Sequence, residues 1–463
     1  MSSTTKKSTR GYIILALDFL LFLTLIKTLP FTPMENRGLA LLVFIGILWL
    51  TEAFNITVTS LMVPILAIGL NVLPTKAAFA PFSEPIIFMF FGGFVLAAVM
   101  NIQKLDLWIA NHIIRLASGN LKLTVLYLFA ATAGLSLFIN NTAVAAMMLP
   151  LTLGILKKVD LKTNRDLYVF VLLGIAFSAS IGGIGTLTGS APNAILASQL
   201  KITFSEWLFY GMPVTILLMI GMVFSLLVIL RPNFNVPFEI SLEEIPMTGK
   251  RKITLAVFVI AAFFLVFGSW LEPMIRSALE LSQPIKNFDA VVAMTAVIIL
   301  CVTHTATWSE IQDRTEWGVL MLFGGGLVLG IVLKETGASK ILADTIVSYI
   351  GVQHWLVMTL VLTAFIVFLT EFTSNTATAA LMIPIFISVA EGVGLPSVSL
   401  AAIVACSASC AFMLPIATPP NAIVFSTGYI KQSEMVKVGF LLNIISTLVI
   451  GGLTYFFWIN WGK

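Results

Sequence analysis

The sequence predicts an all-α polytopic membrane protein, because it is apolar, poorly charged and divided into runs of spanning length. Of its 463 residues, 59% are hydrophobic and 10% are charged, whereas soluble domains carry about 25% charged residues. No soluble core could bury this much apolar sequence. The net charge of +4 is small, and no basic patch interleaved with aromatic residues suggests a nucleic-acid partner.

Apolar segments of spanning length recur to the end of the chain. The first follows a basic N-terminus and is too long for a signal peptide, so it is expected to be an uncleaved membrane helix. A helix needs about 20 apolar residues to cross a bilayer, and about eleven segments approach that length. They cover residues 12–30, 38–56, 58–73, 84–101, 167–187, 207–230, 253–273, 286–303, 316–333, 398–416 and 438–460.

Two further apolar stretches, 123–156 and 356–390, are interrupted at their centres by polar residues. A polar bend at the bilayer midplane is tolerated only where protein or a cavity surrounds it. Each stretch is therefore predicted to be a re-entrant helical hairpin with a polar tip. The first tip is Asn140-Asn141-Thr142 and the second tip is Ser374-Asn375-Thr376.

The placement of lysine and arginine predicts the orientation in the membrane. With the N-terminus in the cytoplasm, the basic clusters at 6–10, 157–165 and 250–252 all fall inside, and the outer loops keep only scattered positive charges. The protein is therefore expected in the cell inner membrane, in contact with lipid, with its C-terminus outside. The amphipathic segments 103–119 and 334–350 are expected to lie flat in the interface, although plain loops would also fit.

The chain repeats itself in three blocks that keep the same order and spacing. FFGGFVLAAV (90–99) matches LFGGGLVLGI (322–331), NNTAVAAMMLP (140–150) matches SNTATAALMIP (374–384), and SASIGG…GSAPNAI (178–195) matches SASCAF…ATPPNAI (407–423). An odd number of spans in each copy inverts the second copy relative to the first. Inverted repeats with broken helices in matching positions are typical of secondary transporters, whose site lies at the repeat interface near the midplane.

The repeat divides the chain into four parts. Residues 1–37 hold the cytoplasmic N-terminus and the first helix, and residues 231–252 form a cytoplasmic linker. The first repeat covers 38–230, with its hairpin at 123–156 and a broken helix at 167–201; the second covers 253–463, with its hairpin at 356–390 and a broken helix at 398–430.

The tips and the broken helices offer helix ends to ligands. Asn141 and Asn375 are placed to cap the second arm of each hairpin, whose free N–H groups suit an anion. The carbonyl groups that end each first arm suit a hard cation, which takes oxygen ligands. In GSAPN (189–193) and ATPPN (417–421) proline forces a break, and Asn193 and Asn421 are expected to cap the restarted helices.

Neither tip and neither proline loop contains a lysine or an arginine. A doubly charged anion buried there needs positive charge nearby, because isolated buried charge is very costly. Co-bound Na⁺ would supply that charge, so the sequence predicts coupling to sodium. The alternative, that these polar residues only join helices, does not explain why both clusters occur twice.

The remaining charged and cysteine residues are weaker candidates for a functional site. Glu371 lies in an apolar stretch and is either a proton or cation ligand or a structural partner, and the first repeat has Leu137 in its place. Cys301, Cys406 and Cys410 lack metal-ligand spacing and are expected to be buried hydrophobes. The sequence shows no catalytic triad or zinc motif, so an enzyme is not expected.

The doubled tips and proline loops resemble those of the divalent anion:sodium symporter (DASS) family, closest to its bacterial Na⁺/dicarboxylate symporters. The resemblance covers nearly the whole chain. It implies a homodimer in which a transport domain carries the hairpins and moves like an elevator against a scaffold domain. One Na⁺ site would then use Ser136, Asn140, Asn141 and Gly189, and the other Thr370, Thr373, Asn375 and Ala417.

The predicted function is import of C4-dicarboxylates such as succinate, malate or fumarate by Na⁺ symport. A Na⁺-independent dicarboxylate exchanger of the same fold is the alternative. The family's first tip usually reads Ser-Asn-Thr, so Asn140 is a departure that bears on cation affinity and substrate choice. The residues expected to contact substrate are Asn140, Asn141, Thr142, Ser190, Ser374, Asn375, Thr376, Thr418 and Pro419.

Overall fold

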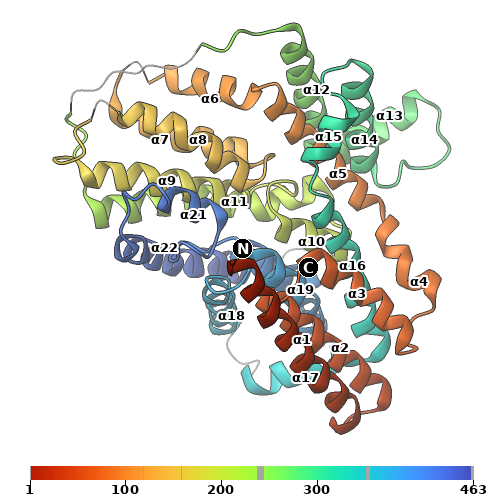
Figure 1. Cartoon of the computed structure of the whole chain (residues 1–463). Helices are drawn as coiled ribbons and strands as arrows, with labels where there is room; N and C mark the ends of the chain where they lie inside the picture. The colour runs from red at the N-terminus through yellow and green to blue at the C-terminus, as the bar shows by residue number, and fades with distance from the viewer. Residues whose placement is uncertain (1, 118, 158, 237–243, 351–354, 460–463) are drawn as a thin grey trace.

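The computed structural model describes residues 2–117, 119–157, 159–236, 244–350 and 355–459. Every regular element in these ranges is a helix (Figure 1), which confirms the all-α class. The order of elements is the same in both halves: the sequence from α5 to α11 is repeated from α16 to α22.

The first helices are separated by short, well-capped turns. Thr32 and Glu35 form a capping box at the start of α2, and the Asn55 side chain caps α3. Such caps satisfy N–H groups that the helix itself leaves free. The helices are α1 (Ser2–Thr28), α2 (Pro33–Thr51), α3 (Ile56–Gly69), α4 (Thr75–Phe79), a 3₁₀ turn (Ala80–Ser83) and α5 (Pro85–Ile102).

In the rest of the first half the chain is interrupted between α7 and α8 and between α9 and α10. Both interruptions fall where the polar motifs predict them, because proline and short polar side chains favour helix starts over helix interiors. The helices are α6 (Leu105–Arg115), α7 (Leu121–Ser136), α8 (Asn141–Leu156), α9 (Arg165–Gly182), α10 (Ala191–Leu200) and α11 (Phe204–Leu230).

The second half follows the same plan after a sharply bent pair. The span expected over 253–273 is not one straight helix, because α12 and α13 meet at an angle of 98°. The helices are α12 (Gly249–Val266), α13 (Gly268–Ala278), α14 (Phe288–Val302), α15 (Trp308–Arg314), α16 (Trp317–Thr336), α17 (Ala338–Ile350), α18 (Trp355–Leu369), α19 (Asn375–Gly392), α20 (Ser397–Ser407), α21 (Pro419–Phe425), α22 (Gln432–Leu453) and a final π turn (Thr454–Trp458).

Eight helices among the described residues are long and apolar enough to cross a membrane, or nine with the bent pair. About eleven were expected. Three of the expected spans form helices of only 14, 15 and 11 residues, namely α3, α14 and α20. Conversely, α19, expected as a hairpin arm, passes the test. The two segments expected to be amphipathic interfacial helices contain α6 and α17.

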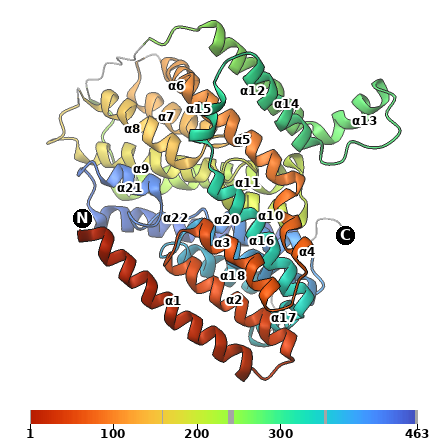
Figure 2. The same cartoon turned by 45° about the vertical axis from the view of Figure 1, so that its right-hand side comes forward.

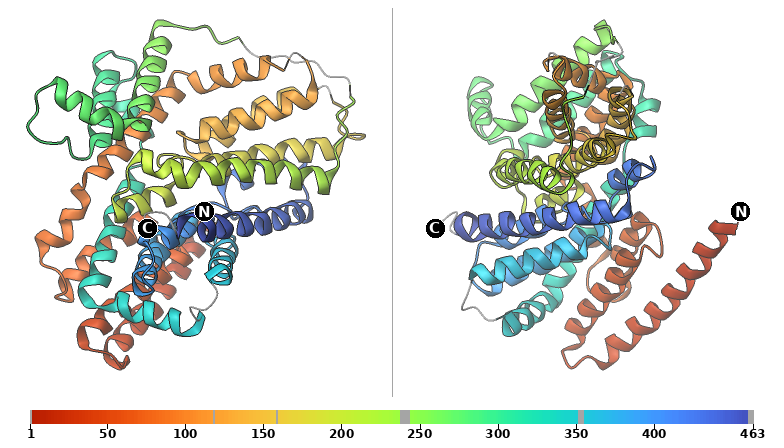
Figure 3. Two further views of the ribbon diagram at one scale, coloured as in Figure 1. Left: turned by 180° about the vertical axis from the view of Figure 1, so that it is seen from behind. Right: turned by 90° about the vertical axis from the view of Figure 1, so that its left-hand side faces the viewer.

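The helices pack in two groups that meet near the centre. In the first group, called the hairpin unit, α7–α11 interlock with α18–α22, and α21 lies against α8 and α9. In the second, called the frame, α2, α3, α5, α14 and α16 contact one another (Figures 1 and 2). Helix α1 lies at the edge of the molecule against α2 (Figure 3), outside the repeat, as the sequence predicts.

Candidate functional site

Each hairpin breaks at its polar tip, but the caps lie one residue earlier than expected. Helix α8 begins at Asn141, and the side chain of Asn140 caps it by accepting the N–H of Thr142 at 2.8 Å. Helix α19 begins at Asn375, and its N-cap residue Ser374 makes no capping side-chain bond. Asn141 and Asn375 are therefore not the caps, and their side chains contact other polar groups instead.

Asn141 belongs to a group of oxygens between the first hairpin and the broken helix. Ser136 Oγ lies 2.7 Å from Asn141 Oδ1 and 2.6 Å from the carbonyl oxygen of Ala179. A hydroxyl has one proton and can serve only one of these oxygens at a time. The other close contact needs a second proton donor or a cation between its two atoms.

Two arrangements of Asn141 can satisfy this contact. If its amide is turned over, Nδ2 donates to Ser136 Oγ at 2.7 Å, to Ala179 O at 3.1 Å and to Gly189 O at 3.2 Å. If Oδ1 faces inward, the same atoms form an oxygen cage that fits a hard cation. The cage leaves no room for a side chain at Gly183, where a Cβ would lie 2.3 Å from Asn141 Oδ1.

The second hairpin repeats this arrangement. Thr370 Oγ1 lies 2.7 Å from Asn375 Oδ1 and 2.9 Å from the carbonyl oxygen of Ala408. Thr370 is fully buried, as is Ser136. Thr373 instead bonds within its own hairpin, to the carbonyl of Leu369 at 2.9 Å and to Thr378 Oγ1 at 2.6 Å.

The broken helices are held open by asparagines that do not act as caps. Asn193 Nδ2 donates to the carbonyls of Gly183, Ile184 and Thr186 at 2.8–3.1 Å. Asn421 Nδ2 likewise donates to the carbonyls of Ala411 and Leu414 at 3.0 and 3.1 Å. The actual N-cap residues are Ser190 and Thr418. Each asparagine thus stabilises unwound backbone that would otherwise lose its hydrogen bonds.

The two halves meet at these breaks. Ser190 Oγ lies 3.0 Å from Ser409 Oγ of the second broken helix, and the rings of Phe177 and Phe412 pack edge to face. Both tips and both proline loops open into one cavity of about 980 Å³. All nine predicted substrate residues line it: Asn140, Asn141, Thr142, Ser190, Ser374, Asn375, Thr376, Thr418 and Pro419.

Among the described residues, the charged groups that line this cavity are Arg10, Glu52, Glu316 and Glu371. Neither Arg10 from the N-terminal helix nor the two glutamates from the frame side stood out in the sequence. Three carboxylates and one guanidinium leave the lining with more negative than positive fixed charge. A dianion therefore meets unfavourable electrostatics there unless cations accompany it.

Glu371 bonds to the second broken helix. Its Oε1 accepts the N–H groups of Phe412 and Met413 at 2.8 and 2.9 Å and the side-chain N–H of Asn443 at 2.7 Å, and its Oε2 accepts the N–H of Leu414 at 3.2 Å. All four contacts are donated to the carboxylate. This arrangement favours the structural role over the role of cation ligand.

Sequence reasoning also missed Ser180 and two backbone carbonyls of the site. Ser180 lines the cavity, is 1% exposed, and its Oγ has no hydrogen-bond partner among the described residues. The backbone carbonyls of Ala179 and Ala408 complete the two oxygen groups. The repeated SAS triplet at 178–180 and 407–409 was the available signal, but a carbonyl carries no side-chain signature.

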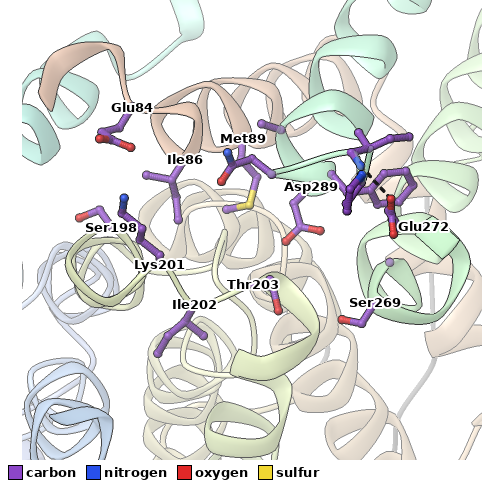
Figure 4. A pocket seen from close by; sticks show the side chains of 16 residues that line it. Glu84, Ile86, Met89, Ser198, Lys201, Ile202, Thr203, Ser269, Glu272 and Asp289 are labelled. Atoms are coloured by element: carbon purple, nitrogen blue, oxygen red, sulfur yellow. Dashed lines mark hydrogen bonds between the residues drawn. The ribbon is translucent and has the colours of Figure 1, made fainter. Parts of the chain in front are cut away.

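A second, smaller cavity of about 260 Å³ lies where the turn between α10 and α11 faces α13 and α14. Figure 4 shows it, with Asp289, Glu272 and Lys201 among the labelled residues. Asp289 Oδ2 accepts the N–H of Phe204 at 2.7 Å, and Glu272 Oε1 accepts that of Ile285 at 2.8 Å. These carboxylates bind backbone, so the cavity is a joint between helices rather than the candidate site.

Metal-binding chemistry of another kind is not supported. Among the described residues no group of three His, Cys, Asp or Glu side chains could hold a metal ion. The oxygens gathered at Ser136 and Thr370 come instead from hydroxyl, amide and carbonyl groups, which suit a weakly bound hard cation.

The comparisons with known proteins agree with this geometry. The family model described as citrate transporter matches residues 46–401. An uncharacterized transporter of Haemophilus influenzae is 54% identical over 454 residues, which is 98% of each chain. The sodium-dependent dicarboxylate transporter SdcS of Staphylococcus saprophyticus is 32% identical over 98% of this chain and 94% of its own.

Two solved structures share the fold at low identity. The YdaH transporter of Alcanivorax borkumensis matches 91% of this chain and 99% of its own with a TM-score of 0.59 at 14% identity. MtrF of Neisseria gonorrhoeae matches 94% and 96% with a TM-score of 0.57 at 12% identity. The chain is thus a multi-pass membrane transporter and not an enzyme, and it belongs to the citrate transporter family, within the divalent anion:sodium symporter group.

Proposed function

We propose that this protein imports C4-dicarboxylates such as succinate, malate or fumarate together with Na⁺. The observation that carries the proposal is the pair of matching polar groups around Ser136 and Thr370, in each of which a buried hydroxyl, an asparagine amide and a carbonyl of the broken helix converge. Na⁺ bound in each group would place positive charge directly behind a tip. The sodium dependence and the dicarboxylate specificity in the name of the SdcS relative support the same assignment.

The proposed first Na⁺ site consists of Ser136, Asn141, Gly189 and the carbonyl of Ala179, and the second of Thr370, Asn375, the carbonyl of Ala408 and, from the family resemblance, Thr373 and Ala417. Asn140, assigned to the first site by the resemblance, turns its side chain to Thr142 and Glu316 here. Substrate carboxylates would bind the tips in front of these sites. The cations would then offset the negative lining of the cavity.

The proposed transport cycle is an elevator motion of the hairpin unit against the frame, in a homodimer in the cell inner membrane. The N-terminus would be cytoplasmic and the C-terminus outside, as the basic loops indicate. The cavity is far larger than a C4-dicarboxylate, and Arg10, Leu50 and Glu52 line one side of it. That side would be the cytoplasmic one in this orientation.

The deciding experiment measures succinate affinity of the purified protein in Na⁺ and in choline at equal ionic strength. We expect binding in Na⁺ and at least tenfold weaker binding in choline, because each cation and the anion strengthen one another reciprocally. Equal affinity in both would contradict sodium coupling. Uptake into proteoliposomes then separates the symporter from the exchanger: an inward Na⁺ gradient drives the former, and internal dicarboxylate drives the latter.

A further inference from the structure

A carboxylate of the chain itself already occupies the first tip. Asn140 Nδ2 donates to Glu316 Oε1 at 2.6 Å, while Asn140 Oδ1 accepts the N–H of Thr142 at 2.8 Å. Both ends of the Asn140 amide are therefore engaged. A carboxylate thus lies at the start of α8, where the helix end favours an anion.

Glu316 reaches this tip from the other group of helices. It directly precedes α16, and α16 packs against α2 and α3 of the frame. Its bond to Asn140 is its one side-chain hydrogen bond among the described residues, and no cation in those residues forms an ion pair with it. The bond therefore joins the hairpin unit to the frame at the substrate cavity.

The second tip has no such partner. Ser374 makes no capping side-chain bond, and within the described ranges no Asp or Glu side chain bonds to Ser374, Asn375 or Thr376. The two tips have matching oxygen groups, but only the first tip has a carboxylate hydrogen-bonded to it among the described residues. The difference coincides with Asn140, whose longer side chain reaches the frame where the serine usual in the family would fall short.

We propose that Glu316 holds the place of a substrate carboxylate at the first tip, and that the substrate must displace it to bind. The inference rests on the proposed dicarboxylate function. Displacement would break this hydrogen bond between the hairpin unit and the frame, which also meet where α10 and α19 contact α16. Glu316 thus determines affinity by competing with the substrate, and it couples binding to movement.

Binding of succinate to the full-length purified protein in saturating Na⁺ tests the proposal without requiring transport. We expect E316Q and E316A to bind succinate about tenfold more tightly than wild type, because a charged competitor for the Asn140 amide is gone. Mere structural damage would weaken binding instead. The matched control is E335Q, which removes an exposed negative charge from the far end of the same helix, α16, outside the cavity, and its succinate affinity should change less than twofold.

A second measurement ties the effect to Asn140. In an N140S background the shorter side chain cannot reach Glu316, so adding E316Q should change succinate affinity by less than twofold. Unchanged or weaker binding by E316Q, an equal gain in E335Q, or a full gain in the N140S background would each overturn the proposal. If wild type fails to bind succinate in Na⁺, the proposed function falls and this inference with it; binding by wild type without a gain in E316Q overturns the inference alone.

Discussion

Ser136 and Thr370 make the same pair of contacts in the two halves of the molecule. Each hydroxyl lies 2.7 Å from the side-chain amide of the asparagine five residues later, and 2.6 or 2.9 Å from an alanine carbonyl of the broken helix beside it. The halves differ widely in sequence outside the motifs. The repeated geometry supports the proposal that each half holds a matching cation site.

Removing either hydroxyl should weaken sodium binding. Ser136→Ala and Thr370→Ala each delete one ligand of a proposed Na⁺ site, and we expect the Na⁺ concentration that half-activates succinate uptake to rise roughly tenfold. The matched controls are Thr132→Ala and Thr363→Ala, which delete buried hydroxyls that bond only within α7 and α18. An equal effect of a control and its partner variant would show that helix damage, not ligand loss, is responsible.

A single added methyl group should block the first site. In Gly183→Ala the new Cβ would lie 2.3 Å from Asn141 Oδ1 and 2.9 Å from the carbonyl of Gly189, so the cage must open. We expect Na⁺-driven succinate uptake to be lost at matched membrane levels. Gly134→Ala, whose Cβ meets nothing within 4 Å, should keep wild-type uptake. Normal sodium dependence in Gly183→Ala would exclude this cage as a cation site.

The loop asparagines should matter most for stability. Asn193→Ala leaves the buried carbonyls of Gly183 and Thr186 without a donor, while that of Ile184 keeps Trp207 Nε1. Asn421→Ala leaves only the carbonyl of Ala411 without a donor, because that of Leu414 keeps the N–H of Ala417. A buried polar group left unsatisfied costs about 1–3 kcal/mol, so both variants should melt earlier in detergent, Asn193→Ala by more. Asn120→Ala removes an exposed helix cap, which is worth about 1 kcal/mol. It serves as the reference against which the loss of stability in the other two variants is compared. A melting temperature unchanged in Asn193→Ala would contradict this role.

The sequence carried enough signal for the helices, the tips and the breaks, because proline, short polar side chains and apolar runs act locally. It predicted that Asn141 and Asn375 belong to the site, although it assigned them as caps. The residue before each of them takes that position, a difference of one residue that pattern reading cannot resolve.

The sequence did not predict the features of the site that depend on tertiary packing. The contact between Asn140 and Glu316 joins residues distant in sequence, and backbone carbonyls such as that of Ala179 have no distinguishing side chain. Hydropathy also overestimated the helix lengths at α3, α14 and α20, which are shorter than the apolar runs that contain them. Such helices need tertiary partners that hydropathy alone does not show.

Glu371→Gln separates the two roles left open for that carboxylate. An amide keeps one acceptor oxygen, so its Nε2 would face the N–H of Leu414, now 3.2 Å from Oε2. Donor opposed to donor in a buried site should destabilise the protein by about 1–3 kcal/mol and lower its melting temperature. Because the cations would bind elsewhere, the charge moved per succinate, measured by reversal potential in proteoliposomes, should not change. Glu52→Gln, an exposed glutamate of the same cavity, serves as the control and should alter neither quantity. A stable Glu371→Gln protein that moves a different charge per succinate would instead make Glu371 a coupling residue.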